Sequence, residues 1–144
     1  MELNIKNEII EDSGTIKIST KLDETSFGSE KLMFESVRNS LERTKVKKLD
    51  TLYLHNSDWL AGNKVTEIAK GLKEILAAGL TSRIGVSVYD EVDLAKILQL
   101  YKIDVVQVPC NILDNRFRRS DLFSTLTNKN IEIQVRSIFL QGVL

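Results

Sequence analysis

The chain has 144 residues, of which 42% are hydrophobic and 28% charged, enough for one domain with a hydrophobic core. Its 20 basic and 20 acidic residues balance, so the composition indicates no nucleic-acid or membrane-surface partner. No apolar run approaches the roughly 20 residues that cross a bilayer, the N-terminus lacks a signal-peptide pattern, and Cys110 is the only cysteine. We therefore expect a single cytoplasmic domain without a disulfide.

Strand-like and helix-like segments alternate along the chain. In chain order they are strand 15–21, helix 29–43, strand 49–55, helix 65–78, strand 83–88, helix 91–100, strand 103–108, helix 121–127 and strand 131–138. Ser29 is expected to cap the first helix and Gly79 to end the second. This order predicts parallel strands joined by right-handed crossovers, and the mostly apolar strands predict a sheet covered on both faces.

Two architectures fit this order of elements, an open doubly wound sheet and a (β/α)8 barrel. The first predicted strand is followed by no G-x-G-x-x-G loop, since the sequence there reads Thr20-Lys21-Leu22-Asp23. This absence disfavours a Rossmann-type sheet. Periodicity alone does not decide between the two.

Polar side chains occur at the carboxyl end of each predicted strand. They are Lys21, His55, Ser87, Gln107, Arg136 and Ser137. In a parallel sheet these ends share one edge, which is the functional edge of both architectures. Histidine is the side chain type that ordinarily titrates near neutrality, so His55 in this position suggests proton chemistry. Gln107 lies within an apolar strand and needs a hydrogen-bond partner if it is buried.

The same residues also have purely structural interpretations. Lys21, taken alone, is more typical of a solvated strand end, and an isolated His55 is more often a hydrogen-bonded loop histidine than a catalytic residue. Ser87 and Ser137 are equally consistent with serines that bond to the backbone, the commonest arrangement for this residue. The residue types alone therefore do not establish a site.

Three other features have simple structural interpretations. We expect Cys110 to pack as a small apolar residue and Asp50 to lie in a helix–strand loop. The cluster of Arg116, Arg118 and Arg119 is expected to form a solvated face, with anion binding as the alternative.

Taken together, these segments resemble the aldo-keto reductase family. Ile18-Ser19-Thr20-Lys21 is similar to the strand that ends in the family's catalytic lysine, and Leu49-Asp50-Thr51-Leu52-Tyr53-Leu54-His55 to its L-D-x-x-Y-L-H signature. Three further stretches resemble later strands of the family: Ile84-Gly85-Val86-Ser87, Val106-Gln107-Val108 with Asn111, and Val135-Arg136-Ser137 with Phe139-Leu140-Gln141-Gly142.

The resemblance implies a (β/α)8 barrel that binds NADPH and reduces a small aldehyde or ketone by hydride transfer. It implies that Lys21 is catalytic, lowering the pKa of a tyrosine proton donor, and that His55 orients or polarises the carbonyl. The residues it assigns to the cofactor are Ser87 and Gln107 at the nicotinamide carboxamide, Arg136 at the nicotinamide and Ser137 near the pyrophosphate.

The chain also departs from the family pattern. The family's aspartate and tyrosine precede the lysine strand, but residues 1–14 contain no tyrosine, and Val88 stands where many members have asparagine. Five strands would correspond to the third to seventh of a barrel that takes about 200 residues or more. We therefore expect residues 1–144 to form one incomplete, truncated barrel domain, inactive alone as a reductase.

An incomplete barrel leaves two sheet edges open, from which we expect self-association. It also leaves the apolar residues 138–144 in need of cover. Two alternatives remain at this point. One is a non-catalytic family member that binds a nucleotide or a partner, and the other is an unrelated open α/β sheet without a site.

Overall fold

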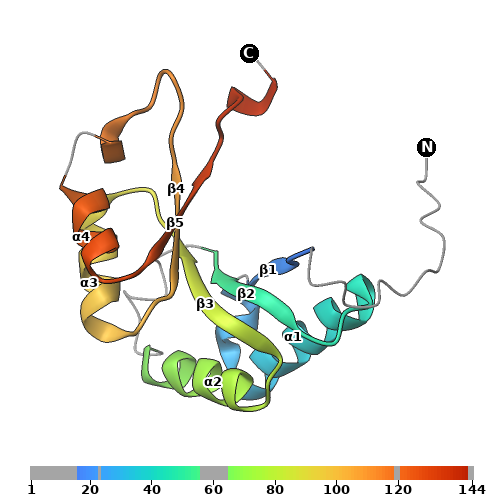
Figure 1. The fold of residues 1–144 in the computed structure, drawn as a ribbon. Helices are drawn as coiled ribbons and strands as arrows, with labels where there is room; N and C mark the ends of the chain where they lie inside the picture. Colours follow the sequence, from blue (N-terminus) through green and yellow to red (C-terminus); the bar gives the residue numbers. More distant parts are fainter. Residues whose placement is uncertain (1–15, 23, 56–64, 119–120, 143–144) are drawn as a thin grey trace.

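The computed structural model describes residues 16–22, 24–55, 65–118 and 121–142. Five strands alternate with four α-helices, as the sequence predicts (Figure 1). The strands are β1 (Ser19–Leu22), β2 (Leu49–Leu54), β3 (Thr81–Ser87), β4 (Val105–Pro109) and β5 (Glu132–Arg136). The α-helices are α1 (Glu30–Thr44), α2 (Val65–Ala77), α3 (Glu91–Leu100) and α4 (Leu122–Asn128). Three short 3-10 helices are η1 (Glu24–Gly28), η3 (Arg116–Arg118) and η4 (Leu140–Gly142).

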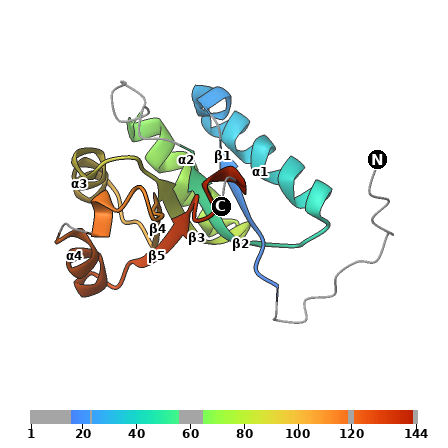
Figure 2. The ribbon, with the colours of Figure 1, turned by 90° about the horizontal axis from the view of Figure 1, so that it is seen from above.

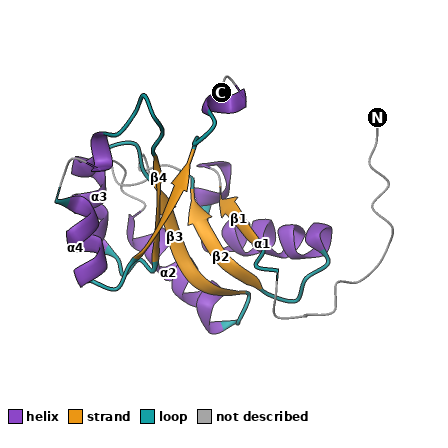
Figure 3. Ribbon diagram, turned by 45° about the horizontal axis from the view of Figure 1, so that its top comes forward, coloured by secondary structure: helices purple, strands orange, loops and turns teal. Residues whose placement is uncertain are grey.

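The strands form one parallel sheet in the order β1-β2-β3-β4-β5, so each pairs with the next strand in sequence. A doubly wound sheet reverses its strand order at a switch point, whereas a barrel adds strands sequentially. Figures 2 and 3 show the sheet curving, with the helices along its outer side. The architecture is therefore an arc of a (β/α)8 barrel, which settles the choice that periodicity left open.

The helix ends follow the predicted capping. Ser29 precedes α1, and its Oγ accepts a hydrogen bond from the Leu32 amide at 3.3 Å. Asp90 caps α3 in the same way through the Asp93 amide. Gly79 follows α2 with φ of 71°, a conformation that favours glycine, and the Leu80 amide then bonds to the Ile75 carbonyl. Ser29 and Asp90 therefore mark the starts of α1 and α3, and Gly79 marks the turn that follows α2.

The core lies between the sheet and the helices. Alternate residues of the central strands point toward the helices and are fully buried: Leu52, Leu54, Ile84, Val86, Val106 and Val108. They pack with the apolar faces of the helices, including Val37, Leu72, Ile75, Leu94 and Ile97. This apolar burial is the main source of stability.

The opposite side of the sheet, which we call the concave face, carries a different set of side chains. In-register residues of a parallel sheet share a face, which places on it Lys21, Thr51, Tyr53, Arg83, Gly85, Ser87, Gln107, Glu132, Gln134 and Arg136. The described helices cover only the other side. Helices thus cover one face of the sheet, and the other face is the one that lines the interior of a barrel.

Several element boundaries differ from the prediction. The first strand begins at Ser19, so Ile16 and Lys17 precede it and are exposed, while Thr15 lies outside the described residues. Asp50 lies within β2 and not in a loop: its amide bonds to the Ile18 carbonyl, and its carboxylate binds the Arg83 side chain. The apolar C-terminal segment is exposed at Ile138 and Phe139, while residues 143–144 lie outside the described part of the chain.

Candidate functional site

The six predicted site residues lie at the carboxyl ends of the five strands. Lys21 is in β1, Ser87 ends β3, Gln107 is in β4 and Arg136 ends β5. His55 directly follows the last residue of β2, and Ser137 directly follows the last residue of β5. Because all strands run in parallel, the sheet brings the six to one edge, where barrels place their chemistry.

Ser87 and Gln107 contact each other directly. They are register partners on β3 and β4, and the Ser87 hydroxyl donates to the Gln107 side-chain carbonyl at 3.4 Å. Ser87 is only 1% exposed and Gln107 is half-buried. A buried hydroxyl beside a buried amide requires such a partner, and the pair presents both donors and acceptors to the concave face.

Lys21 and Arg136 approach each other from the two outermost strands. Partial burial, and next the positive charge of Arg136, lower the pKa of the Lys21 ammonium. The Arg136 guanidinium stacks over the Tyr89 ring at 4.3 Å, a cation–π contact. Its Nε and Nη2 atoms are buried and have no hydrogen-bond partner among the described residues. Two neighbouring cations with open donor groups form a site suited to an anion or an oxygen-rich ligand.

His55 continues the β2 ladder one residue beyond the strand. Its amide donates to the Leu22 carbonyl at 3.1 Å, and its side chain is exposed. Strand alternation puts His55 on the same face as Tyr53, which is the register partner of Lys21. Lys21 and His55 thus lie on the same face, and His55 is two residues beyond Tyr53, the register partner of Lys21.

The residues that follow β4 and β5 shape the loops at this edge. Ser137 is exposed and has φ of 61°, an uncommon conformation for a serine, and its carbonyl accepts from the Leu140 amide. Cys110 is half-buried, and its amide bonds to the Arg136 carbonyl. The Asn111 side chain accepts from the Leu113 and Asp114 amides at 2.9 Å each, so it stabilises its own turn.

The arginine cluster is described only in part. Arg116 is exposed and pairs with Asp114 at 2.8 Å, in agreement with a solvated face. The side chain of Arg118 and the whole of Arg119 lie outside the described part of the chain. Hydrogen bonds and charge from Arg116 also lower the pKa of Asp114.

Sequence reasoning missed a polar network centred on Arg83 and Tyr53, two residues of the concave face. Arg83 pairs with both Asp50 and Glu132, and Thr51 donates to Asp50 at 2.8 Å. The Gln134 amide donates to Glu132 at 2.8 Å and accepts from the Tyr53 hydroxyl. The signal was present in β5, where polar residues 132, 134 and 136 alternate with apolar ones, as in a strand with one polar face.

The tyrosines of the described residues differ in their availability as proton donors. Tyr53 is buried and its hydroxyl is bonded to Gln134; burial, and next the charge of Glu132, raise its pKa to about 12. Tyr101 lies in the α3–β4 connection at the opposite edge of the sheet. Tyr89 is exposed at the carboxyl edge, beneath Arg136. Tyr53 is therefore poorly suited to donate a proton near neutrality.

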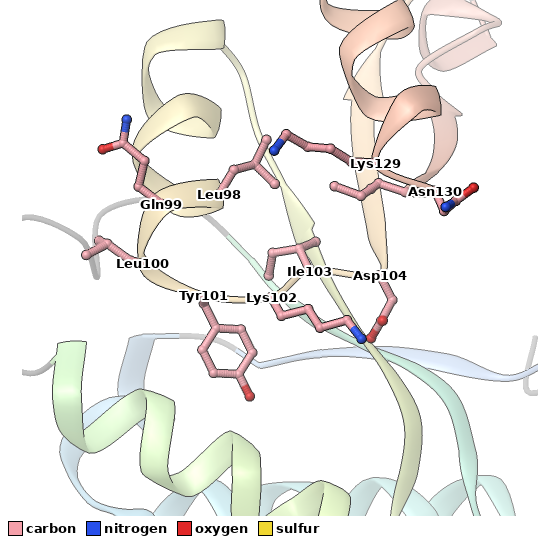
Figure 4. Close-up of a pocket in the computed structure, with 10 residues that line it drawn as sticks. Leu98, Gln99, Leu100, Tyr101, Lys102, Ile103, Asp104, Lys129 and Asn130 are labelled. Atoms are coloured by element: carbon pink, nitrogen blue, oxygen red, sulfur yellow. The ribbon is translucent and has the colours of Figure 1, made fainter.

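Two described cavities lie at the amino edge, away from these residues. One, of about 610 Å³, is lined by the α3–β4 connection and by Lys129, Asn130 and Ile131 (Figure 4). In that view the Tyr101 ring points toward α2. The other, of about 650 Å³, is lined by α2 together with Ser82, Tyr101, Lys102 and Asp104. Neither contains any of the six predicted site residues.

Two further searches covered the described ranges. Within them, no three His, Cys, Asp or Glu side chains are grouped so as to hold a metal ion. No helix in the described part of the chain has the length and apolar character needed to span a membrane.

Comparison with known proteins identifies the group to which this arrangement belongs. A sequence profile of the aldo/keto reductase family matches residues 5–144. The chain belongs to the aldo/keto reductase family. A search of curated proteins gives no match.

Solved aldo/keto reductases share the fold of this family member at low sequence identity. An enzyme from Klebsiella pneumoniae, solved with NADP and acetate, is 20% identical with a TM-score of 0.75 over 88% of this chain and 44% of its own. The holo form of an aldo-keto reductase from Bacillus halodurans is 20% identical with a TM-score of 0.75, over 93% and 47%. An aldose reductase from Giardia lamblia is 19% identical with a TM-score of 0.68, over 85% and 45%.

These matches concern the fold alone, and this aldo/keto reductase chain spans slightly under half the length of each structure. Its five strands form a partial (β/α)8 barrel, as predicted. An unrelated open α/β sheet is therefore excluded.

Proposed function

We propose that this chain forms the part of an NADPH-dependent aldo-keto reductase that holds the nicotinamide and activates a small carbonyl substrate. The observation that carries the proposal is the gathering of residues from all five strands at one edge, with Ser87 and Gln107 in contact. In this assignment Lys21 and His55 act at the carbonyl. The cofactor residues are Ser87, Gln107, Arg136 and Ser137.

The side chains at this edge fit a dinucleotide. A nicotinamide carboxamide both donates and accepts hydrogen bonds, which matches the amide and hydroxyl of the Ser87–Gln107 pair. The unpartnered Nε and Nη2 of Arg136 would bond to cofactor oxygens, and the positive charges of Arg136 and Lys21 favour its phosphates. When bound, the cofactor supplies the hydride; the protein orients the reactants and handles the proton.

We further propose that the 144-residue chain binds NADPH but does not reduce carbonyls unaided. Carbonyl reduction needs a proton donor at the oxygen, and its pKa is best near the working pH. Tyr53 does not meet this need, because its hydroxyl is bonded to Gln134 and its pKa is raised to about 12. The positive charge of the Lys21 ammonium would lower the pKa of a neighbouring donor.

Titration of the purified chain with NADPH, followed by nicotinamide fluorescence, tests this proposal. We expect saturable binding that Gln107→Ala weakens, whereas the matched Gln99→Ala change on the exposed surface of α3 leaves binding unchanged. A panel of aldehydes and ketones should give no NADPH oxidation above background. Absence of binding would overturn the cofactor assignment, and robust turnover would overturn the claim that the chain does not act alone.

A second candidate function, self-association, is favoured by the open edges of the sheet. Among the described strands, β1 and β5 each have one neighbour, and Val135 on β5 is 42% exposed on its helix-facing side. A two-fold axis parallel to the strands would let β5 pair with β1 of a second copy at two equivalent seams and cover both edges. We propose a second copy of this chain as the partner.

Light scattering on a concentration series tests self-association. We expect a dimer that Val135→Lys weakens by placing a charge at the seam. Val92→Lys, at another exposed valine, on α3, is the matched control. A monodisperse monomer at all concentrations would contradict this second function without affecting the first.

A further inference from the structure

The polar network centred on Arg83 and Tyr53 joins strands that are not neighbours in the sheet. Arg83 on β3 pairs with Glu132 on β5, although β4 lies between those strands. The Tyr53 hydroxyl on β2 reaches Gln134 on β5, with β3 and β4 between them. We call these two contacts the cross-arc contacts. Both contacts cross the concave face and join strands that are not paired with each other in the sheet.

Such contacts require strong curvature. Neighbouring strands lie about 4.8 Å apart, so β2 and β5 would be about 14 Å apart in a flat sheet, with side chains standing roughly perpendicular to it. Tyr53 and Gln134 would then not meet. Their contact is possible because Gly85 has no side chain: a Cβ there would lie 2.5 Å from Cε1 of the Tyr53 ring, which crosses β3 at this point.

The same curvature turns the concave faces of the outermost strands, which carry Lys21 and Arg136, toward each other. Lys21 is on β1 and Arg136 on β5, the two ends of the strand order, yet the charge of Arg136 acts on the Lys21 ammonium. The arrangement of the candidate site therefore depends on the curvature of the sheet. No described backbone pairing joins β1 to β5.

Arg83 is the centre of the network that spans the arc. Its side chain is 23% exposed and holds the Asp50 carboxylate, 19% exposed, on one side and Glu132 on the other. Lys17 adds a weaker contact to Asp50 at 4.0 Å. Among the described residues, the side chain of Arg83 pairs with Asp50 and Glu132, neither of which is a candidate site residue, and Ser87 lies four residues further along β3.

We propose that Arg83, through its pairs with Asp50 and Glu132, is a positioning residue that fixes the curvature of the sheet and so brings Lys21 and Arg136 together at the cofactor edge. The inference deepens the proposed function and rests on it for the identity of the ligand. The geometric part, that Arg83 sets the Lys21–Arg136 proximity, stands independently of any cofactor.

The decisive measurement is the pKa of the Lys21 ammonium, followed by NMR titration in folded variants. Glu132→Met removes the ion pair between Arg83 and Glu132, and with it one negative charge. If the loss of the Glu132 charge were the only effect of this substitution, the pKa of Lys21 would fall further. If the arc opens and Arg136 moves away, the pKa of Lys21 rises toward its ordinary value, which is the result we expect.

Arg83→Met and Arg83→Lys complete the series, with Arg38→Met on the exposed face of α1 as the matched control. We expect Arg83→Met to raise the pKa of Lys21 and weaken NADPH binding at least about tenfold, the loss of one charge-assisted hydrogen bond. Arg83→Lys should restore part of both effects, and Arg38→Met should change neither. Circular dichroism confirms that each variant is folded.

The possible outcomes separate this inference from the proposed function. If the wild-type chain does not bind NADPH but Glu132→Met raises the pKa of Lys21, the cofactor assignment fails and the positioning role holds. If the pKa of Lys21 is unchanged or falls in folded Glu132→Met, the positioning role is overturned, whatever happens to NADPH binding. If Arg83→Met does not fold, Glu132→Met alone decides.

Discussion

The two faces of the same sheet are stabilised in different ways. The helix-facing side consists of Leu, Ile and Val side chains that pack without directional bonds. The concave face has ion pairs and hydrogen bonds with fixed partners, centred on Arg83 and Tyr53. Apolar burial is non-directional, whereas hydrogen bonds require a defined geometry. The comparison suggests that the helix-facing side supplies stability and the concave face supplies shape.

The largest effect expected from this comparison is on the helix-facing side. Leu52 is fully buried between the sheet and the helices. Leu52→Ala should lower the free energy of unfolding by about 2–5 kcal/mol, through lost apolar burial and the cavity that remains. Urea unfolding measures it, with Leu100→Ala at an exposed position as the control. If Leu52→Ala lowered the free energy of unfolding by less than a concave-face substitution does, the helix-facing side would not be the main source of stability.

A smaller effect is expected where the concave face is tightly packed. Gly85→Ala would put a Cβ 2.5 Å from Cε1 and 2.6 Å from Cδ1 of Tyr53, closer than real contacts allow. The ring cannot move freely, because its hydroxyl is bonded to Gln134. The expected cost in unfolding free energy is about 1–3 kcal/mol. Gly85→Ala combined with Tyr53→Leu should cost less than the two single changes added together; additivity would indicate that the ring is not the obstacle.

Removing one hydrogen bond from the network should cost less again. Tyr53→Phe keeps the ring over Gly85 and deletes the hydroxyl that Gln134 accepts. We expect a loss of about 0.5–1.5 kcal/mol in the free energy of unfolding, measured by urea denaturation. Tyr53→Phe should cost less in a Gln134→Leu background than in the wild type, because the hydroxyl has already lost its acceptor there. An unchanged stability in Tyr53→Phe would show that the bond contributes nothing to the arc.

The smallest effect is the pH dependence of the network. Burial alone would raise the pKa of Asp50, but hydrogen bonds from Arg83 and Thr51, with the charge of Arg83, lower it overall. Hydrogen bonds from Gln134 and then Arg83 lower the pKa of Glu132. A carboxyl with a pKa lowered by folding stabilises the folded state above its unfolded pKa and loses this contribution as the pH falls through the folded pKa.

The ordinary values are 3.8 for Asp and 4.5 for Glu, so the network's contribution should be present above pH 4.5 and disappear as the pH falls below 3.8. Urea midpoints measured from pH 7 to about pH 3 test this in the wild type and Arg83→Met. The wild-type midpoint should fall more steeply at the acid end, since Arg83→Met has already lost the pairs. Parallel curves would show that other carboxylates carry the acid sensitivity.

Local patterns predicted the elements of this fold but not its cross-arc contacts. Alternation and helical spacing located every strand and α-helix, because each element buries one face of its own sequence. The parallel strand order predicts that the carboxyl ends of all strands lie together. Ser87 and Gln107 are in contact there, as this order predicts. Asp50 was misassigned to a loop because its partner Arg83 lies 33 residues away, and no short window contains both.

The proximity of Lys21 and Arg136 could not be predicted from periodicity either. A flat sheet and a curved one share the same alternation, so the pattern that places both residues on one face does not give the distance between them. Curvature depends on which side chains fit inside the arc, such as the Tyr53 ring over Gly85. Gly85 in a strand was a possible signal, since a glycine there often marks close approach of another group.

The sequential strand order also has a consequence for how the chain folds. Each strand pairs with the next one along the sequence, so each β-α-β unit closes a short loop and can form as soon as its residues are available. The Tyr53–Gln134 contact spans 81 residues and the Arg83–Glu132 contact 49. These contacts bear a larger loop-closure entropy, and they can form only once β5 has joined the sheet. The sheet would thus assemble strand by strand and acquire its final curvature in the last step.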